Sequence, residues 1–289
     1  MLQRQDIRRQ CRGSSVRRMI DMLNIAVCIK SVPDPEYYEK ITIDPVSKRL
    51  VRDGIPAVIN EADTHAIEEA LRLKETCGGT ITIVSMGPPA AQKQMKEALA
   101  MGADQAYLIS DRKVGGADTL ATSYTLAKTL ETTGSYDVIF TGSESADGAT
   151  AHVPSQLGVW LNAAHATNVI HTEWNEGMVV TKQFENGRGK YRLKTPCVIG
   201  VSSKANEVRF NTVQNILAVK NKPCTILSAA DLKNLDETRL GLAGSPSQNG
   251  EVEAIEANKE CVMLTGSENE IAEKIVEIIR QKAGGKENL

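Results

Sequence analysis

The stretch LNIAVCIKSVPD, at residues 23–34, decides the fold. Its first seven residues are mostly apolar or β-branched over the length of one strand, and prolines at 33 and 35 end the run. A strand that is apolar on both faces is typical of a parallel sheet covered by helices. The segment therefore predicts the first buried strand of an α/β protein.

Strands and helices then alternate along the chain. Three further segments have the composition of buried strands: TITIVSMG (80–87), QAYLIS (105–110) and DVIFTG (137–142). Four segments have helical spacing of apolar residues: 61–75, 88–101, 117–132 and 151–161. This alternation predicts βαβ units and a doubly wound, mostly parallel sheet.

Two regions depart from that alternation. Residues 41–54 (ITIDPVSKRLVRDG) predict a hairpin-like excursion. After Ala166, three short segments with a period of two predict an antiparallel meander, followed by an apolar strand at 196–203. The three segments are NVIHTEW (168–174), MVVTKQF (178–184) and KYRLKT (190–195).

The two ends differ from this centre. Residues 1–21 carry six arginines and two acidic residues without an apolar period, so we expect a disordered basic extension. Residues 236–259 are polar and rich in turns, too poor in apolar residues for a core of their own. A capping box at 267–270 then opens a final helix with an isoleucine stripe, which must pack on its own sheet or on a partner.

Composition excludes several classes of function. The formal charge is −2, with only three Phe and two Trp, which argues against nucleic-acid binding. No apolar run approaches the roughly 18 residues of a membrane span. The six cysteines stand singly, without the spacing of a metal site, and predict buried thiols in a reducing cytoplasm. Any redox chemistry must then come from a bound cofactor.

Two loops that follow predicted strands contain the groups that hold phosphate. GGADTLATS (115–123) brings glycines and hydroxyls to a helix N-terminus, and GSESADGATAHV (142–153) brings small residues and hydroxyls to another. Amides at a helix N-terminus favour an anion. Each loop alone is also compatible with an ordinary turn, in which Asp118 and Asp147 serve as caps. Their occurrence in one sheet favours nucleotide binding.

Catalytic motifs of hydrolases, metalloproteases and thiol enzymes are absent from the sequence. The four histidines show no metal spacing. His152 lies in a candidate loop, where it either faces a ligand or caps the following helix. The residues themselves therefore predict a nucleotide-binding protein and no particular reaction.

Several motifs together resemble the beta subunits of electron transfer flavoproteins. Besides the two loops, they are IAVCIKSVPD, IDPVSKRLVRDG, INEADTHAIEEALRLKE, VSMGPP, ALAMGADQAYL and NEVRFNTVQNILAVKNKP, in the family's order over residues 22–232. The resemblance implies a Rossmann-like fold of the adenine nucleotide alpha-hydrolase type. It also implies a heterodimer with an alpha subunit that holds a flavin.

The resemblance further implies the contents of the beta subunit's own site. This site holds AMP in the classical group and a second FAD in the electron-bifurcating group, and the 115–123 loop looks like the bifurcating group. Residues matching the family's nucleotide contacts are Cys28, Asn60, Asp63, Met86, Asp118, Thr119, Thr122, Gly142, Ser143, Ala146, Asp147, Gly148, Ala149, Thr150, Ala151, His152 and Val153. Bifurcating relatives usually read DGDTAQVG where this chain reads DGATAHVP (147–154).

Three functions remain open at this stage. The first is a bifurcating subunit with FAD that exchanges a hydride with NAD(H) and serves ferredoxin and a flavin dehydrogenase, such as an acyl-CoA dehydrogenase. The second is a subunit with structural AMP, and the third is a stand-alone nucleotide-binding protein of the universal-stress type. For the first two we expect a basic extension (1–21), a nucleotide-binding domain (22–235) and an arm with a helix on the partner (236–289).

Overall fold

The computed structural model describes residues 22–40, 42–43, 50–51, 54–247 and 261–284. The chain divides into two compact units, residues 1–251 and residues 252–289. The expected basic extension at 1–21 lies outside the described residues. None of the helices within the described ranges is long and apolar enough to cross a membrane.

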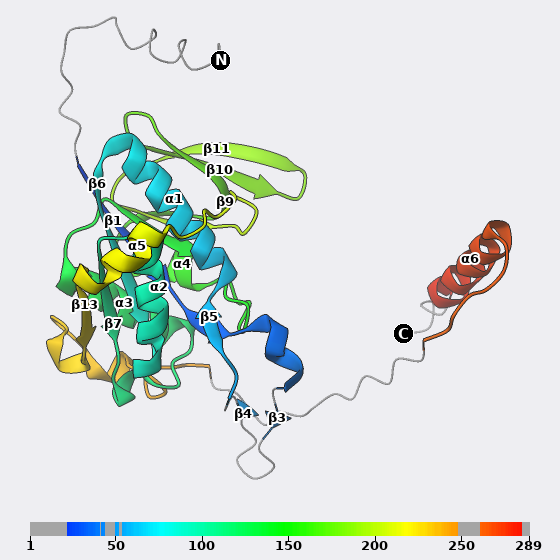
Figure 1. Ribbon diagram of the computed structural model, residues 1–289, viewed down its shortest axis with the longest axis horizontal. Helices are drawn as coiled ribbons and strands as arrows, with labels where there is room; N and C mark the ends of the chain where they lie inside the picture. Colours follow the sequence, from blue (N-terminus) through cyan, green and yellow to red (C-terminus); the bar gives the residue numbers. More distant parts are fainter. Residues whose placement is uncertain (1–21, 41, 44–49, 52–53, 248–260, 285–289) are drawn as a thin grey trace, which may run out of the picture. The chain divides into compact units, whose positions relative to one another are not determined.

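Nine strands of the larger unit form one sheet (Figure 1). In order across the sheet they are β11 (Gly187–Leu193), β10 (Met178–Phe184), β9 (Ala164–Trp174), β12 (Cys197–Val201), β8 (Val138–Gly142), β1 (Leu23–Ile29), β6 (Gly79–Met86), β7 (Gln105–Ile109) and β13 (Cys224–Leu227). All neighbours from β9 to β13 are parallel, whereas β9, β10 and β11 pair antiparallel. The doubly wound sheet and the meander are confirmed.

Helices cover both faces of this sheet because its central strands are apolar on both sides. Helices α1 (Glu61–Cys77) and α2 (Gln92–Met101) pack on the face that contains Val27, in front of the sheet in Figure 1. Helices α3 (Thr119–Thr133) and α4 (Val153–Trp160) pack on the opposite face with Ala26. Neighbouring residues of β1 thus serve different cores, as the alternation of side chains along a strand requires.

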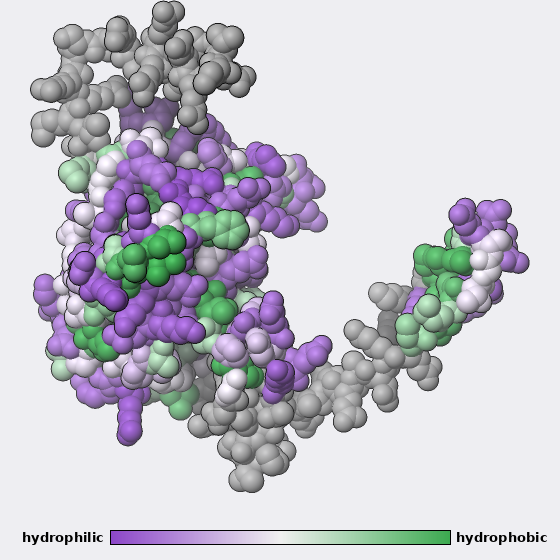
Figure 2. Space-filling model, viewed as in Figure 1, coloured by the Kyte–Doolittle hydropathy of each residue, from purple (hydrophilic) through white to green (hydrophobic). Residues whose placement is uncertain are grey.

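Shorter elements complete the larger unit. Two small antiparallel pairs are β2 (Ser31–Pro33) with β5 (Ala57–Ile59), and β3 (Thr42–Ile43) with β4 (Leu50–Val51). The short helices are α5 (Val213–Ala218), η1 (Pro35–Lys40), η2 (Pro89–Ala91), η3 (Arg112–Val114), η4 (Val219–Asn221), η5 (Ala229–Asp231) and η6 (Glu237–Arg239). Side chains of α5 form an exposed apolar patch (Figure 2), with Ile216 and Leu217 both more than half exposed.

Two strands differ from the sequence prediction. Residues 31–35 were expected to form a loop, but residues 31–33 form strand β2, which pairs with β5 and ends at Pro33. Strand β13 was not predicted because it is short and lies at an edge, with Thr225 and Ile226 exposed, so it lacks a buried apolar run.

The smaller unit contains helix α6 (Glu268–Gly284). One half of the predicted capping box is present, since Glu270 Oε2 accepts hydrogen bonds from the Ser267 amide at 2.8 Å and hydroxyl at 2.9 Å. Within this unit the isoleucine stripe is exposed, including 60 % of Ile279. Whether residues 236–289 pack on a partner subunit stays a prediction.

The strand order fixes where a ligand can bind. From β1 the chain proceeds to β6 and β7 on one side, and then returns to β8 on the other side of β1. The crevice beyond the carboxyl ends of strands at such a reversal is the usual ligand site of an open α/β sheet.

Candidate functional site

A cavity of about 1060 Å³ lies beyond the carboxyl ends of β1, β6, β7 and β8. It brings together nearly all the residues that were singled out in the sequence. The predicted residues that line it are Cys28, Asn60, Asp63, Met86, Asp118, Thr119, Thr122, Gly142, Ser143, Asp147, Gly148, Thr150, Ala151, His152 and Val153. Ala146 and Ala149 belong to the same loop but do not line the cavity.

Asp63 ties together the two strands at the reversal. Its side chain is buried, and its oxygens accept hydrogen bonds from the backbone amides of Lys30 at 2.7 Å and Gly142 at 2.8 Å. Burial raises the pKa of Asp63 from 3.8 to about 7, although these hydrogen bonds and one involving Asn60 oppose the shift. A Cβ atom on residue 142 would lie 2.3 Å from Asp63 Oδ1, so glycine is required there.

Asn60 holds the loop that follows β8. Its Nδ2 group donates to the Glu144 carbonyl and its Oδ1 accepts from the Ala146 amide, both at 2.9 Å. On the same loop, Ser143 Oγ donates to the Gly200 carbonyl at 2.9 Å. The loop is therefore fixed from two sides before any ligand binds. Ala146, which does not line the cavity, thus helps to fix the loop through the hydrogen bond of its amide to Asn60.

In the rest of this loop the Gly148 and Ala149 amides donate to the Ser145 carbonyl, at 3.3 and 2.7 Å, whereas residues 150–153 line the cavity. Ala149 and Ala151 have left-handed backbones, with φ of 44° and 55°, a conformation that residues with a Cβ atom rarely adopt. Among the described residues, no acceptor contacts the amides of 150–153. Strain combined with unpaired donors is typical of a ligand-binding loop.

The start of α3 has a different arrangement. Asp118 is the N-cap, and its Oδ1 accepts from the amides of Leu120 at 2.9 Å and Ala121 at 3.0 Å. These two amides are therefore not available to a phosphate. The hydroxyl-bearing residues Thr119 and Thr122 still line the cavity. The capping interpretation of Asp118 holds, and the residue lines the cavity as well.

Cations at the cavity wall were missed in the sequence. The Lys30 ammonium lies 2.5 Å from Asp147 Oδ1 and 3.3 Å from Ser145 Oγ, and Arg112 lines the wall from η3. The position of Lys30 directly after the first strand could have indicated that it lies near the site. Its approach to a loop more than a hundred residues away depends on the strand order.

Thiol chemistry is unfavourable in this cavity. The Cys28 side chain is buried, and its burial together with the nearby Asp63 carboxylate raises the pKa of its thiol. The protonated thiol is a poor nucleophile. Cys28 thus contributes its backbone and its apolar surface.

Comparison with known proteins agrees with this architecture. The model of the "Electron transfer flavoprotein domain" family matches residues 48–232. The chain is 37% identical over 262 residues to "Electron transfer flavoprotein subunit beta" of Thermoanaerobacterium thermosaccharolyticum, covering 90% of this chain and 99% of that protein.

Two further relatives have other names. The chain is 36% identical to "Caffeyl-CoA reductase-Etf complex subunit CarD" of Acetobacterium woodii, over 90% of this chain and 99% of that protein. It is 34% identical to "Protein FixA" of Azorhizobium caulinodans, over 88% and 92% respectively. The match to the family model and the near-complete coverage of these relatives lead to one conclusion: the chain belongs to the electron transfer flavoprotein family, among its beta subunits.

Proposed function

We propose that this beta subunit binds FAD in the cavity at the strand reversal and exchanges a hydride with NAD(H), for electron bifurcation between ferredoxin and a flavin dehydrogenase. Beta subunits of this family pair with an alpha subunit. The observation that carries the proposal is the cavity itself. Its volume of about 1060 Å³ lies just above the range for small-molecule sites, roughly 300–1,000 Å³, which favours a dinucleotide over a mononucleotide.

The donors around the cavity suit a diphosphate. The amides of residues 150–153 are unpaired within the described chain, and they precede or begin α4. Each contact of an anion with a helix N-terminus contributes about 0.3–1 kcal/mol when exposed and up to ~2 kcal/mol when partly buried. Arg112 and the Lys30 ammonium, which forms an ion pair with Asp147, provide cationic donors at the wall. The chain thus has enough donors to bind two phosphates without a phosphate-binding glycine motif.

The residues of the cavity bind and orient; they do not supply the redox chemistry. A flavin, when bound, accepts a hydride as an electron pair and passes electrons on singly. The chain contributes a fixed loop held by Asn60, a buried carboxyl group at Asp63, and the hydroxyl-bearing residues Thr119 and Thr122. Such preorganisation keeps the orientation of a bound cofactor constant.

The partners follow from the same proposal. One relative carries a caffeyl-CoA reductase–Etf complex in its name, which supports a flavin dehydrogenase as the electron partner of this chain. We propose the cytoplasm as the location, because Cys28, Cys77 and Cys197 are buried free thiols of a kind that persists in reducing compartments.

A subunit with structural AMP is the second candidate. It is favoured by the start of α3, where Asp118 already occupies the amides of Leu120 and Ala121. If only the loop at 150–153 offers amides, a single phosphate is sufficient to occupy them. The Asp-to-Ala difference at Ala149 from bifurcating relatives points in the same direction.

The decisive experiment counts nucleotides in the purified heterodimer with alpha. We expect two FAD per heterodimer and no AMP; one FAD and one AMP would overturn the proposal. Thr119→Arg or Gly148→Glu should expel the beta flavin by bulk or like charge while alpha keeps its own. Thr76→Arg, at an exposed position on α1, is the matched control and should retain both flavins. NADH-driven ferredoxin reduction should stop only in the cavity variants.

A further inference from the structure

The first part of the arm, residues 236–247, packs on other elements of the larger unit, to which it belongs; we call this segment the brace. Leu240 is 2% exposed and lies in an apolar cluster with Val114 and Tyr124. Ser245 is also buried. A segment predicted to be too poor in apolar residues for a core of its own is therefore anchored on a core that other elements of this chain form.

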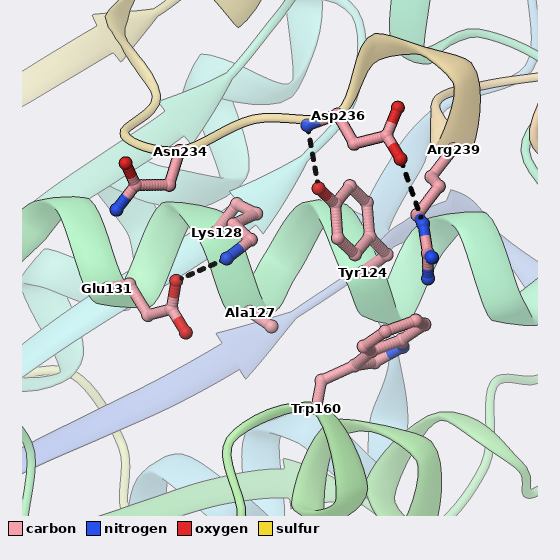
Figure 3. A pocket seen from close by; sticks show the side chains of 8 residues that line it. All are labelled: Tyr124, Ala127, Lys128, Glu131, Trp160, Asn234, Asp236 and Arg239. Atoms are coloured by element: carbon pink, nitrogen blue, oxygen red, sulfur yellow. Dashed lines mark hydrogen bonds and ion pairs between the residues drawn. The ribbon is translucent and has the colours of Figure 1, made fainter.

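Aromatic side chains of α3 and α4 hold the beginning of the brace (Figure 3). The Tyr124 hydroxyl accepts a hydrogen bond from the Asp236 amide at 2.8 Å. The Arg239 guanidinium lies over the rings of Trp160 and Tyr124, 5.4 and 5.8 Å from their centroids, and its Nε donates to Asp236 Oδ2 at 3.1 Å. Trp160 in turn donates to Ser123 Oγ at 3.1 Å.

The end of the brace contacts the N-cap of α3. Ser245 Oγ accepts from the Asp118 amide at 2.8 Å and donates to the Gly241 carbonyl at 2.7 Å. The Ser247 amide donates to Asp118 Oδ2 at 3.0 Å. Asp118 therefore uses one carboxylate oxygen for the helix and the other for the brace, while its own amide is held by Ser245.

Between these two ends the brace lies directly on the loop before α3. The Leu242 amide donates to the Gly115 carbonyl at 3.1 Å. Gly241 has a left-handed φ of 51°, and a Cβ atom there would lie 2.2 Å from the Lys113 carbonyl oxygen. This backbone-to-backbone approach requires glycine. The brace thus fixes the loop whose residues Gly115 and Gly116 line the cavity.

We infer that the brace positions one wall of the cofactor site, and that Ser245 is a positioning residue that fixes Asp118 and the start of α3 against the cavity. This inference rests on the proposed function, since it assumes that the cavity holds the nucleotide of the beta subunit. The contacts are all within one chain and link residues 127 and 129 positions apart.

Ser245→Ala in the full-length chain, purified as the heterodimer, tests the inference. It leaves the Asp118 amide without its acceptor, so hydrogen exchange at Asp118 should accelerate about tenfold. Nucleotide binding in the cavity should weaken, and the visible circular dichroism of the beta-bound flavin should change. Ser245→Thr keeps the hydroxyl and should restore the slow exchange.

Ser247→Ala is the matched control, because Ser247 reaches Asp118 through its backbone amide and that contact is retained. Unchanged exchange and nucleotide affinity in Ser245→Ala would overturn the inference. So would uniformly faster exchange over the whole sheet, since Ser245 would then stabilise only the fold. If the wild-type cavity contains AMP, the proposed FAD is wrong, but locally faster exchange with weaker AMP binding would still support the brace.

Discussion

Replacing Asp63 by asparagine isolates the buried carboxyl group that joins β1 to β8. Its oxygens accept hydrogen bonds from the amides of Lys30 and Gly142 at 2.7 and 2.8 Å. Asparagine has nearly the same volume but only one acceptor oxygen, so one of these amides loses its partner. Asparagine also does not titrate. The variant therefore removes every pH effect that originates at this position.

The size of the pH effect on the free energy of unfolding follows from the pKa of Asp63, which burial raises from 3.8 to about 7. Folding then takes up a proton between these two values, and the free energy of unfolding falls as the pH rises. The stabilisation from the protonated carboxyl group is fully present below about pH 4 and is lost as the pH passes about 7. Since one pKa unit corresponds to about 1.4 kcal/mol, wild type should lose about 3 kcal/mol relative to Asp63→Asn between pH 5 and 8.

Thermal unfolding at fixed heterodimer concentration measures this difference, because ligand and partner concentrations shift the apparent stability. For a unit of roughly 150–250 residues, 1 kcal/mol corresponds to about 2–4 °C. From pH 5 to pH 8 the Tm of wild type should therefore fall about 6–12 °C further than that of Asp63→Asn. Glu97→Gln, an exposed carboxyl on α2, should follow wild type. Parallel Tm profiles for wild type and Asp63→Asn would refute the reasoning.

Three other substitutions test separate contacts. Gly142→Ala places a Cβ atom 2.3 Å from Asp63 Oδ1 and should cost about 1–3 kcal/mol in chemical denaturation, whereas Gly134→Ala, with its nearest contact at 3.5 Å, should be tolerated. Lys30→Met removes a half-exposed cation and should weaken nucleotide binding about two- to fivefold in a titration, an effect that added salt should abolish. Arg239→Ala removes the stacking on two aromatic rings and should destabilise the brace by about 0.5–1 kcal/mol, measured by local hydrogen exchange; unchanged exchange would contradict it.

The sheet could be predicted from the sequence because each strand and helix is encoded by the residue pattern of its own short segment. The run from Leu23 to Ile29 is apolar on both faces, and helices of suitable length separate the following strands. The rules for parallel connections narrow the possible topologies, but the order of the strands was not predicted. The cavity could still be located, since loops after parallel strands meet at one edge of the sheet. Thr119, in one of these loops, and Met86, which the family resemblance implied, both line the cavity.

The contacts within the site could not be predicted in this way. Lys30 reaches Asp147, and Ser245 reaches Asp118, across more than a hundred residues in each case. Such pairs depend on side-chain reach and on the path of a loop, which leave no periodic pattern. Composition alone also gave no sign of where residues 236–247 pack, because one buried leucine and a glycine with a left-handed backbone anchor an otherwise polar segment.

Asp118 has the capping role that the sequence left open, and it also lines the cavity. As the N-cap it takes the amides of Leu120 and Ala121, so an anion in the cavity cannot use them. The donors left for phosphate then include the amides of 150–153 and the hydroxyl groups of Thr119 and Thr122, which also line the cavity. A carboxylate at the wall keeps its negative charge when neutral amides donate hydrogen bonds to it, but these amides partly offset its potential and fix both of its oxygens. The brace therefore holds an acidic side chain in place beside a site that is proposed to hold an anion.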